Sequence, residues 1–291
     1  MSSIKNNQNK SIDKPASPLL SVVVSCKGAE KILSQQLKFL NKQNLTKELW
    51  QAVFIFREDF ALRPVISLIK QYFPLSQIFC LKANRPLYEM RNLAFDRLDS
   101  PYLYFIDEDV ILESAHHLSR LIEIHQKRPD QAVLGGSYLN HPDSTFWGDC
   151  YNWLVRLWVR AYKTKNHQDL APAGNLSIKG YKAFKARFYS PHGFGAEELY
   201  FFKVLHKEGL LSYADKALDA PHLAQHTFKD FIQRAWIHGK SLPKQKKLAS
   251  KALFFEEPAG FLIKIAGLFY LLLVRFSLIW SQLKLFVSKM A

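Results

Sequence analysis

The sequence predicts an α/β fold with a mostly parallel sheet flanked by helices, and three observations lead to this prediction. Strand-like and helix-like segments alternate between Leu19 and about Tyr138. The strand-like segments are short apolar runs rich in β-branched or aromatic residues, as is typical of strands buried in a parallel sheet. One of them, Tyr102 to Ile106, ends in three successive carboxylates, at the strand end where α/β sheets bind their ligands.

The expected elements follow one another in a regular order. Apolar β-branched runs predict strands, and apolar residues three and four positions apart predict helices. The expected strands span residues 19–25, 52–56, 78–81, 102–106 and 132–139, and the expected helices span residues 32–40, 65–72, 87–98 and 115–126. Such a series of strand, helix and strand builds a parallel sheet with helices on both faces.

Asp107 and Asp109 follow the fourth expected strand and form a D-x-D motif. Side chains two residues apart in an extended chain point the same way, so we expect the two carboxylates to converge. Two carboxylates at this strand end suit a hard divalent cation that carries a phosphorylated substrate. An acidic turn before the next helix is the alternative interpretation.

The composition is that of a folded and strongly basic protein. The 291 residues are 48% hydrophobic and carry a formal net charge of +15, which implies a polyanionic partner. Lysines at positions 240–251 precede an apolar C-terminal segment and favour a membrane surface as the partner. No motif for nucleic-acid binding is found, so we expect no nucleic acid as a partner.

The polar first 17 residues lack the apolar core of a signal peptide, and the three cysteines are widely spaced, so we expect a reducing cytoplasm.

Two common phosphate-binding motifs are missing from the sequence. It contains no G-x-x-x-x-G-K-[ST], and its G-x-G at Gly193 and Gly195 follows no clear strand. A P-loop NTPase and a dinucleotide oxidoreductase are therefore disfavoured. The charge of a phosphate group must then be met by a metal ion or by Arg and Lys side chains.

Six short motifs, taken in order, carry a resemblance to a known family. They are LLSVVVS in the first strand, Arg57-Glu58-Asp59, Asn84 with Arg91-Asn92, Phe105 to Asp109, Ala173 to Ile178, and Glu197-Glu198. Each motif alone is weak, so the resemblance rests on their order. Over roughly residues 18–240 the chain resembles family 2 glycosyltransferases with the GT-A fold. The resemblance implies that residues 18–140 bind a nucleotide-diphospho-sugar donor and that residues 141–240 bind the acceptor.

The resemblance also implies a metal site. Asp109 matches the metal-binding aspartate of the family, Asp107 matches the one that faces the ribose or the metal, and His222 matches a closing histidine, with His226 as the alternate. The expected ion is Mg²⁺ or Mn²⁺, which stabilises the negative charge of a diphosphate leaving group. Arg91 matches an arginine that contacts phosphate or ribose, and a solvated helix arginine is the alternative.

Further positions complete the nucleotide-sugar site that the resemblance implies. They are Ser25, Lys27, Glu58, Asp59, Gly174 and Asn175. Either Glu58 or Asp59 is expected to bind the base. Gly174 would allow the backbone to approach the ligand closely, and Asn175 would hydrogen-bond a sugar hydroxyl, the alternative being a plain turn into a strand.

The pair Glu197-Glu198 matches the Glu-Asp of the family, whose second acid is the general base. We therefore expect Glu198, with Glu197 as the other catalytic candidate, to remove the proton of the acceptor hydroxyl. Glu in place of Asp shifts the carboxylate by one methylene. An acidic first turn of a helix is the structural alternative, and it is compatible with catalysis.

In the C-terminal segment, which begins at Phe254, ten uncharged and mostly aliphatic residues lie between Lys264 and Arg275. A membrane span needs about 20 mostly apolar residues. Lys264 and Arg275 lie about 20° apart around a helix and share one face. A single polar stripe favours a helix lying in the membrane interface, and a span or a buried packing helix are the alternatives. We expect residues 241–291 to form a basic linker and a membrane-associated apolar helix.

Together these features predict a glycosyltransferase with a GT-A domain at residues 18–240. It would work at the cytoplasmic face of the membrane, held there peripherally or by a single C-terminal helix. The expected reaction is a metal-dependent, inverting transfer of a sugar to a hydroxyl group of an envelope glycan or a lipid-linked acceptor. A metal-dependent nucleotidyltransferase and a catalytically silent GT-A membrane scaffold are the alternatives.

Overall fold

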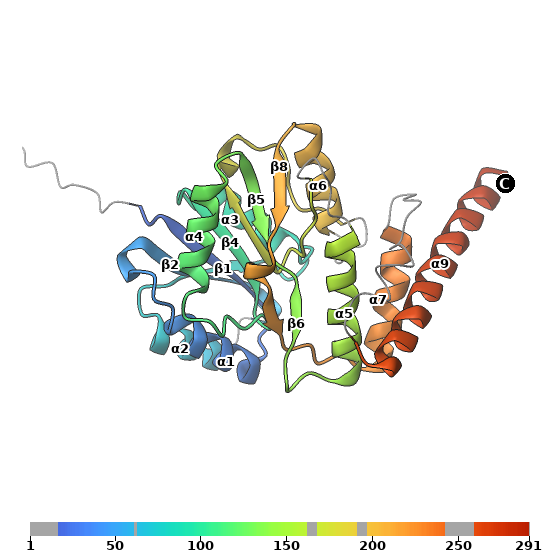
Figure 1. Cartoon of the computed structure of the whole chain (residues 1–291), viewed down its shortest axis with the longest axis horizontal. Coiled ribbons are helices and arrows are strands. Elements are labelled where there is room, and N and C mark those ends of the chain that lie inside the picture. Colours follow the sequence, from blue (N-terminus) through green and yellow to red (C-terminus); the bar gives the residue numbers. More distant parts are fainter. Residues whose placement is uncertain (1–16, 61–62, 162–167, 191–196, 242–258, 291) are drawn as a thin grey trace, which may run out of the picture.

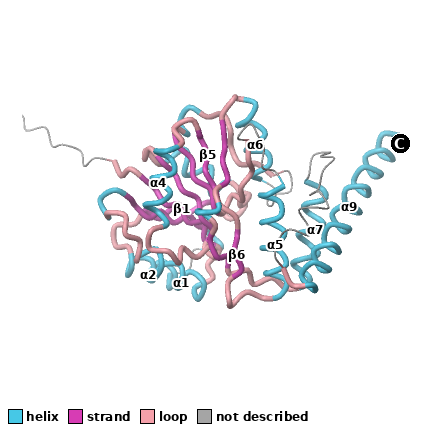
Figure 2. The backbone as a smooth tube through the Cα atoms, in the orientation of Figure 1, coloured by secondary structure: helices cyan, strands magenta, loops and turns pink. Residues whose placement is uncertain are grey.

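The computed structural model describes residues 17–60, 63–161, 168–190, 197–241 and 259–290 (Figure 1). The expected polar tail and the expected basic linker lie almost entirely outside the described residues. The described chain forms a central sheet covered by helices on both faces, with a further group of helices beside it (Figure 2). The predicted α/β fold class is confirmed.

The main sheet has seven strands in the order β3-β2-β1-β4-β7-β5-β8. Strand β7 runs antiparallel to its neighbours β4 and β5, and the other neighbouring pairs are parallel. A separate two-stranded sheet pairs β6 with β9 in parallel. The strands are β1 Leu20–Cys26, β2 Trp50–Arg57, β3 Gln77–Leu81, β4 Tyr102–Asp107, β5 Gln131–Gly135, β6 Tyr138–Asn140, β7 Asn175–Lys179, β8 Leu211–Ala214 and β9 Ala220–His222.

Helices cover both faces of the main sheet because its central strands are apolar on both sides. On one face, Val22 and Val24 of β1 pack with α1, α2 and α4; on the other face, Val23 packs with α3 and α6. These helices are α1 Glu30–Asn41, α2 Arg63–Tyr72, α3 Glu89–Arg97, α4 His117–Lys127 and α6 Glu197–Lys207. The four helices expected from the sequence correspond to α1 to α4.

The segment 132–139 was predicted as one strand, and the structure corrects this. Strand β5 ends at Gly135 and β6 begins at Tyr138 in the other sheet. A Cβ atom on Gly136 would lie 2.0 Å from the carbonyl oxygen of Leu218, so the chain passes directly against another backbone segment at this point. The apolar pattern predicts the strand character of both pieces, but it carries no information about that contact.

Helices α5 Phe146–Ala161, α7 Phe228–Ser241 and α9 Phe261–Met290 form the group beside the sheet (Figure 1). They enclose their own apolar core, centred on Trp153, Phe231 and Tyr270. Two glycines allow close helix contacts. A Cβ on Gly267 of α9 would lie 2.2 Å from the Trp153 ring, and a Cβ on Gly239 of α7 would lie 2.4 Å from the Val274 carbonyl oxygen.

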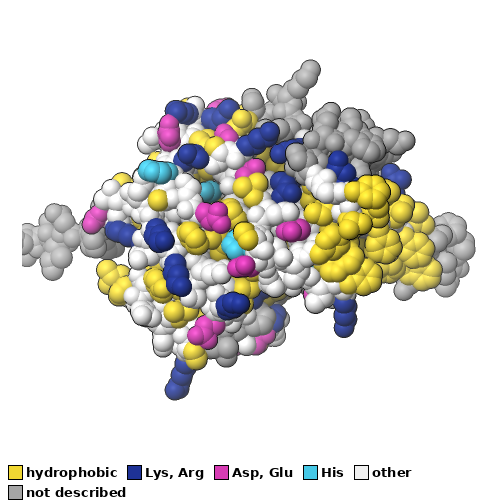
Figure 3. All heavy atoms as spheres, turned by 60° about the horizontal axis from the view of Figure 1, so that its bottom comes forward, with side chains coloured by type: hydrophobic (Ala, Val, Ile, Leu, Met, Phe, Trp, Pro, Cys, Tyr) yellow, Lys and Arg dark blue, Asp and Glu magenta, His cyan; other side chains and the backbone are white. Residues whose placement is uncertain are grey.

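Helix α9 is the apolar C-terminal helix that the sequence predicts, and it is apolar on two faces. Ala266, Tyr270 and Val274 are buried against α5 and α7. The outward face carries large exposed apolar side chains, which gather in one patch at the α9 side of the molecule (Figure 3). This patch, called the α9 face below, comprises Phe261, Leu262, Ile265, Leu268, Phe269, Leu272, Phe276, Ile279 and Trp280. Within the described residues, no helix has both the length and the apolar character needed to cross a membrane.

Candidate active site

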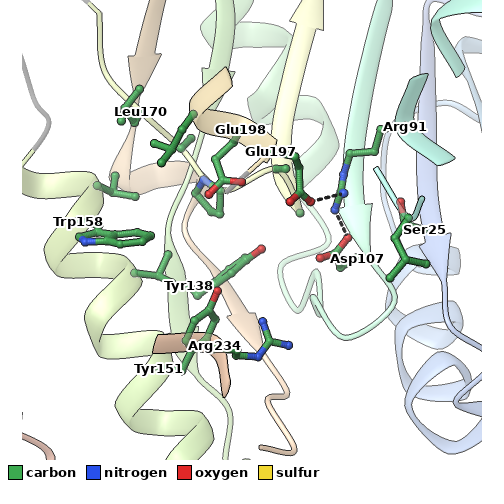
Figure 4. A pocket seen from close by; sticks show the side chains of 18 of the residues that line it. Ser25, Arg91, Asp107, Tyr138, Tyr151, Trp158, Leu170, Glu197, Glu198 and Arg234 are labelled. Carbon is green, nitrogen blue, oxygen red and sulfur yellow. Dashed lines mark hydrogen bonds and ion pairs between the residues drawn. The ribbon is translucent and has the colours of Figure 1, made fainter. Parts of the chain in front are cut away.

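A cavity lies at the carboxyl ends of β1 and β4, bordered by α5, α6 and α7 (Figure 4). The two strands are paired so that Ser25 stands opposite Asp107, which brings the end of the first strand beside the D-x-D motif. The predicted site residues that line this cavity are Ser25, Lys27, Arg91, Asp107, Gly174, Glu197 and Glu198. They come from distant parts of the sequence, and the sheet brings them together.

Arg91 of α3 joins two of the carboxylates. Its Nη2 donates to Asp107 Oδ1, and its Nη1 donates to Glu197 Oε1 at 3.0 Å (Figure 4). The side chain is only 7% exposed, so the alternative of a solvated helix arginine is wrong. Burial opposes its charge, but Asp107 and then Glu197 outweigh burial and raise the pKa of Arg91. The guanidinium thus stays charged and ties the end of β4 to the start of α6.

Glu197 and Glu198 are the first two residues of α6. Glu197 is paired with Arg91, whereas burial, followed by the negative charge of Glu197, raises the pKa of Glu198 to about 8. A carboxyl group with a pKa near neutrality can act as a general base without remaining permanently charged. The structure therefore gives these adjacent acids different chemistry.

Gly174 allows the backbone to lie directly against the acidic end of β4. A Cβ atom at this position would lie 2.5 Å from Tyr138 Oη and 2.6 Å from Asp107 Oδ2. The Gly174 carbonyl also accepts a hydrogen bond from the Asp107 backbone nitrogen at 3.3 Å. A side chain here would displace Asp107 or Tyr138.

Asp109, the second acid of the D-x-D motif, lies beside His222 of β9, with His222 Nε2 3.3 Å from Asp109 Oδ1. Asn152 of α5 fixes the histidine ring, because its amide nitrogen donates to the His222 carbonyl at 2.9 Å and its Oδ1 therefore faces Nδ1 at 2.6 Å. Since Oδ1 only accepts, Nδ1 carries a proton. In a neutral ring the Nε2 lone pair then points at a carboxylate oxygen.

This arrangement fits a cation. Burial opposes ionisation of Asp109, but His222 outweighs burial and lowers the pKa of the carboxyl group. Asp109 Oδ1 is buried and makes no well-aligned hydrogen bond. A carboxylate oxygen and an imidazole nitrogen that face each other can share either a proton or a divalent metal ion. No group of three or more His, Cys, Asp or Glu side chains with metal-binding geometry occurs in the described parts of the chain.

Glu108, the middle residue of the motif, has a role that sequence reasoning did not identify. Its Oε2 accepts hydrogen bonds from the backbone nitrogens of Lys27 at 2.9 Å and Gly28 at 3.1 Å. Gly28 has a φ of 83°, which favours glycine. Glu108 therefore holds the turn that carries Lys27 into the cavity.

Asp109 and His222 are not part of the cavity lining, and three residues predicted to bind the nucleotide sugar also lie elsewhere. The side chain of Asn175 is buried, where Nδ2 donates to the carbonyls of Ser137 and Leu218 and Oδ1 accepts from Tyr104. Its amide is satisfied inside the protein, so the expected contact with a sugar hydroxyl is corrected to a structural role.

Glu58 and Asp59 follow β2 as predicted, but they do not line the cavity. Asp59 accepts two hydrogen bonds from Arg57, at 2.6 and 2.5 Å, at the surface. That one of these acids binds a base stays a prediction.

Several cavity residues were not predicted as site residues. Tyr151 and Trp158 lie on α5, Tyr138 begins β6, and Arg234 and His238 come from α7. Tyr151, Val155 and Trp158 are spaced at four and three residues, but such an apolar stripe indicates a buried helix face as readily as a site. Charge gave the clearer signal, because Arg234 is a cation with Phe231, Ile232, Ala235 and Trp236 all within three residues of it.

Comparisons with known proteins place these features in a family context. Residues 21–192, more than half of the chain, match the family model described as "Glycosyl transferase family 2". No curated protein matches the sequence.

Solved structures share the fold. The mannosyltransferase PcManGT from Pyrobaculum calidifontis, solved in complex with GDP-Man and Mn²⁺, superposes with a TM-score of 0.56 at 14% identity and covers 95% of this chain and 77% of its own. TarS from S. aureus gives a TM-score of 0.50 at 17% identity over 75% of this chain and 39% of its own. TarS 1-349 in complex with UDP gives a TM-score of 0.50 at 14% identity and covers 87% of this chain and 70% of its own. At these identities the likeness shows the fold alone.

Proposed function

This chain belongs to glycosyl transferase family 2, and we propose that it transfers a sugar with inversion from a nucleotide-diphosphate donor to an acceptor hydroxyl, with Glu198 as general base. The observation that carries the proposal is the arrangement of acids in one cavity. Asp107 and Glu197 are held by Arg91, while Glu198 stands beside them with a pKa raised to about 8 by burial and then by Glu197.

The chemistry requires one positioned base. Glu198 takes the proton from the acceptor hydroxyl as its oxygen attacks the anomeric carbon. The bond from that carbon to the diphosphate oxygen breaks on the opposite side, and the diphosphate leaves with the electron pair. Because attack and departure occur on opposite faces, the configuration of the sugar inverts.

Other residues of the cavity bind and orient the donor. Arg91 keeps Asp107 in one orientation at the end of β4, beside Ser25. Lys27 and Arg234 add positive charge to the same cavity. Cationic side chains in a partly enclosed site favour a diphosphate, which becomes more negative as the glycosidic bond breaks.

We further propose that Asp109 and His222 hold a Mg²⁺ or Mn²⁺ ion. The facing lone pairs of these two residues support this proposal, and the mannosyltransferase with the same fold was solved with Mn²⁺. When bound, the ion would act as a Lewis acid that stabilises the diphosphate leaving group. Asn152 fixes the tautomer of His222, as partners of metal-binding histidines generally do.

The proposed location is the cytoplasmic face of a membrane. The α9 face and the net charge of +15 support peripheral attachment to an anionic bilayer. A lipid-linked or envelope-glycan acceptor would be reached at that surface.

Calorimetric titration with UDP, GDP and CMP, with Mn²⁺ or with EDTA, tests the proposal on the wild-type protein and on Asp109→Asn. We expect metal-dependent binding of one nucleotide, weakened about tenfold or more in the variant. The matched control is Asp130→Asn, an exposed acid outside the cavity. Folded protein that binds no nucleotide in either condition would favour the silent scaffold.

A further inference from the structure

The cavity has two chemically different halves. Ser25, Arg91 and Asp107 form a polar half, and Trp158 and Leu170 lie on the opposite side (Figure 4). Glu198 stands between the two halves in the same view. A nucleotide diphosphate suits only the polar half, because its charges need hydrogen-bond donors and cations.

The apolar half extends along two segments. Val155, Trp158 and Val159 lie on one face of α5, and residues 170–173, Leu-Ala-Pro-Ala, form the facing wall. Val155 and Val159 are buried, but Trp158 and Leu170 remain only half-buried. Apolar surface left exposed to water in a cavity is unfavourable, and an apolar ligand group that covers it gains binding free energy.

Neither of the two arginines of α5 next to this stretch, Arg156 and Arg160, lines the cavity. Arg156 donates to the Tyr138 carbonyl at 2.7 Å and to Asn140 Oδ1 at 3.0 Å. His238, which also lines the cavity, lies with its ring centroid 5.0 Å from that of Trp158, and its Nδ1 is already hydrogen-bonded to Tyr270 Oη. The described lining of this half therefore offers mainly apolar contacts rather than the dense set of hydrogen bonds that a free sugar requires.

From this geometry we infer that the apolar half is the acceptor subsite and that it binds a hydrocarbon group attached beside the attacking hydroxyl. The inference rests on the proposed function, since the attacking oxygen must lie within reach of Glu198. With the donor on the Asp107 side of Glu198, the rest of the acceptor extends along Trp158 and Leu170. The acceptor class is thus a lipid-linked or alkyl-linked alcohol.

The position of α5 supports a lipid as the source of this hydrocarbon. One side of the helix lines the subsite with Trp158, and another side packs Trp153 against Gly267 of α9. Helix α9 in turn presents the exposed apolar α9 face. A single helix therefore connects the subsite with the surface proposed to contact a bilayer.

Two matched probes test the inference: n-octyl β-D-glucoside, used below its micelle concentration, and methyl β-D-glucoside. Each is titrated into the protein saturated with the nucleotide and metal that bind it. Every buried methylene strengthens binding about fourfold, so burial of a few methylenes gives the octyl probe a preference of about tenfold or more. The variant Leu170→Asn, nearly equal in size, should lose most of that preference and bind the nucleotide as before. Leu75→Asn, an exposed leucine away from the cavity, should behave as the wild type.

Equal binding of the two probes by wild type, or an unchanged preference in Leu170→Asn, would overturn the inference. Loss of octyl binding in Leu268→Asn on α9 but not in Leu170→Asn would assign the alkyl chain to the α9 face and would also overturn it. Failure of the proposed function has a separate signature, since folded wild-type protein would then bind no nucleotide at all.

Discussion

At the scale of single residues, the surroundings of Glu198 lead to a pH dependence. Burial, then the charge of Glu197, raises its pKa to about 8, and a base acts only when deprotonated. We expect kcat/KM to rise about tenfold per pH unit below that value and to level off above it. The measurement is the rate of sugar transfer from about pH 6 to about pH 9, with stability checked at each pH. A flat profile would exclude Glu198 as the base.

Removing the carboxylate gives a second prediction. Glu198→Gln keeps the shape of the side chain but cannot accept the proton, so kcat should fall by about 10²- to 10⁴-fold, while nucleotide binding changes little. Glu208→Gln, an exposed acid just beyond the same helix, is the control. If Glu198→Gln transfers sugar as fast as that control, the base is another group.

Gly174 gives a third prediction, one of packing. The methyl group of Gly174→Ala would lie 2.5 Å from Tyr138 Oη and 2.6 Å from Asp107 Oδ2. Displacement of Asp107 should lower activity by about 10²-fold, since a misplacement of about 1 Å has that effect. Gly260→Ala, where an added Cβ meets nothing within 4 Å, is the control for activity and melting temperature. Equal activity of both variants would mean that Asp107 tolerates the shift.

The sequence predicts residues of this site well where a strand end fixes their position. Asp107 and Ser25 lie at the ends of neighbouring strands, and alternation along a strand determines which way they point. Asn175 shows the limit of that reasoning. The motif that contains Asn175 was found beside the cavity. The direction of the Asn175 amide, however, depends on its hydrogen bonds to the carbonyls of Ser137 and Leu218, and no local sequence pattern indicates those contacts.

At the scale of elements, strands and helices that carry a clear period were predicted within a few residues, from β1 to α4. The prediction was wrong at residues 132–139, where contact with a distant backbone divides the strand between two sheets. Helix α5 was not predicted, although it contributes Tyr151 and Trp158 to the cavity. Its polar residues Asp149, Asn152, Arg156 and Arg160 recur every three or four positions on one face, so the sequence does carry the helical period of α5.

Contact between α5 and α9 leads to an element-scale prediction. A Cβ on Gly267 would lie 2.2 Å from the Trp153 ring, which is fully buried. Gly267→Val should therefore push α9 away from α5 and lower the free energy of unfolding by about 1 to 3 kcal/mol. Urea unfolding measures this, with Leu268→Ala on the exposed side of the same helix as control. If the two variants are equally stable, the contact is not tight in solution.

At the scale of the whole molecule, the α9 face has an arrangement suited to a bilayer surface. Its large apolar side chains point outward, and the sequence from Phe261 to Ala291 carries lysines and an arginine but no acidic residue. Apolar groups that enter the headgroup boundary, together with cations that attract anionic lipids, form the usual basis of peripheral attachment. Another copy of the protein would cover the same apolar side chains, but its own net charge of +15 would repel these cations.

Vesicle binding distinguishes these two partners. We expect the wild type to co-sediment with vesicles containing phosphatidylglycerol, more weakly at high salt because screening reduces the attraction between the cations and anionic lipids. Leu268→Asn combined with Leu272→Asn removes two of the exposed side chains and should weaken binding at least about tenfold, whereas Leu75→Asn, also exposed but far along the chain, should not. Gel filtration of the same proteins provides the opposing outcome. If the double variant converts a dimer to a monomer and leaves vesicle binding unchanged, the α9 face is an interface between copies of the chain, and attachment to lipid must lie elsewhere.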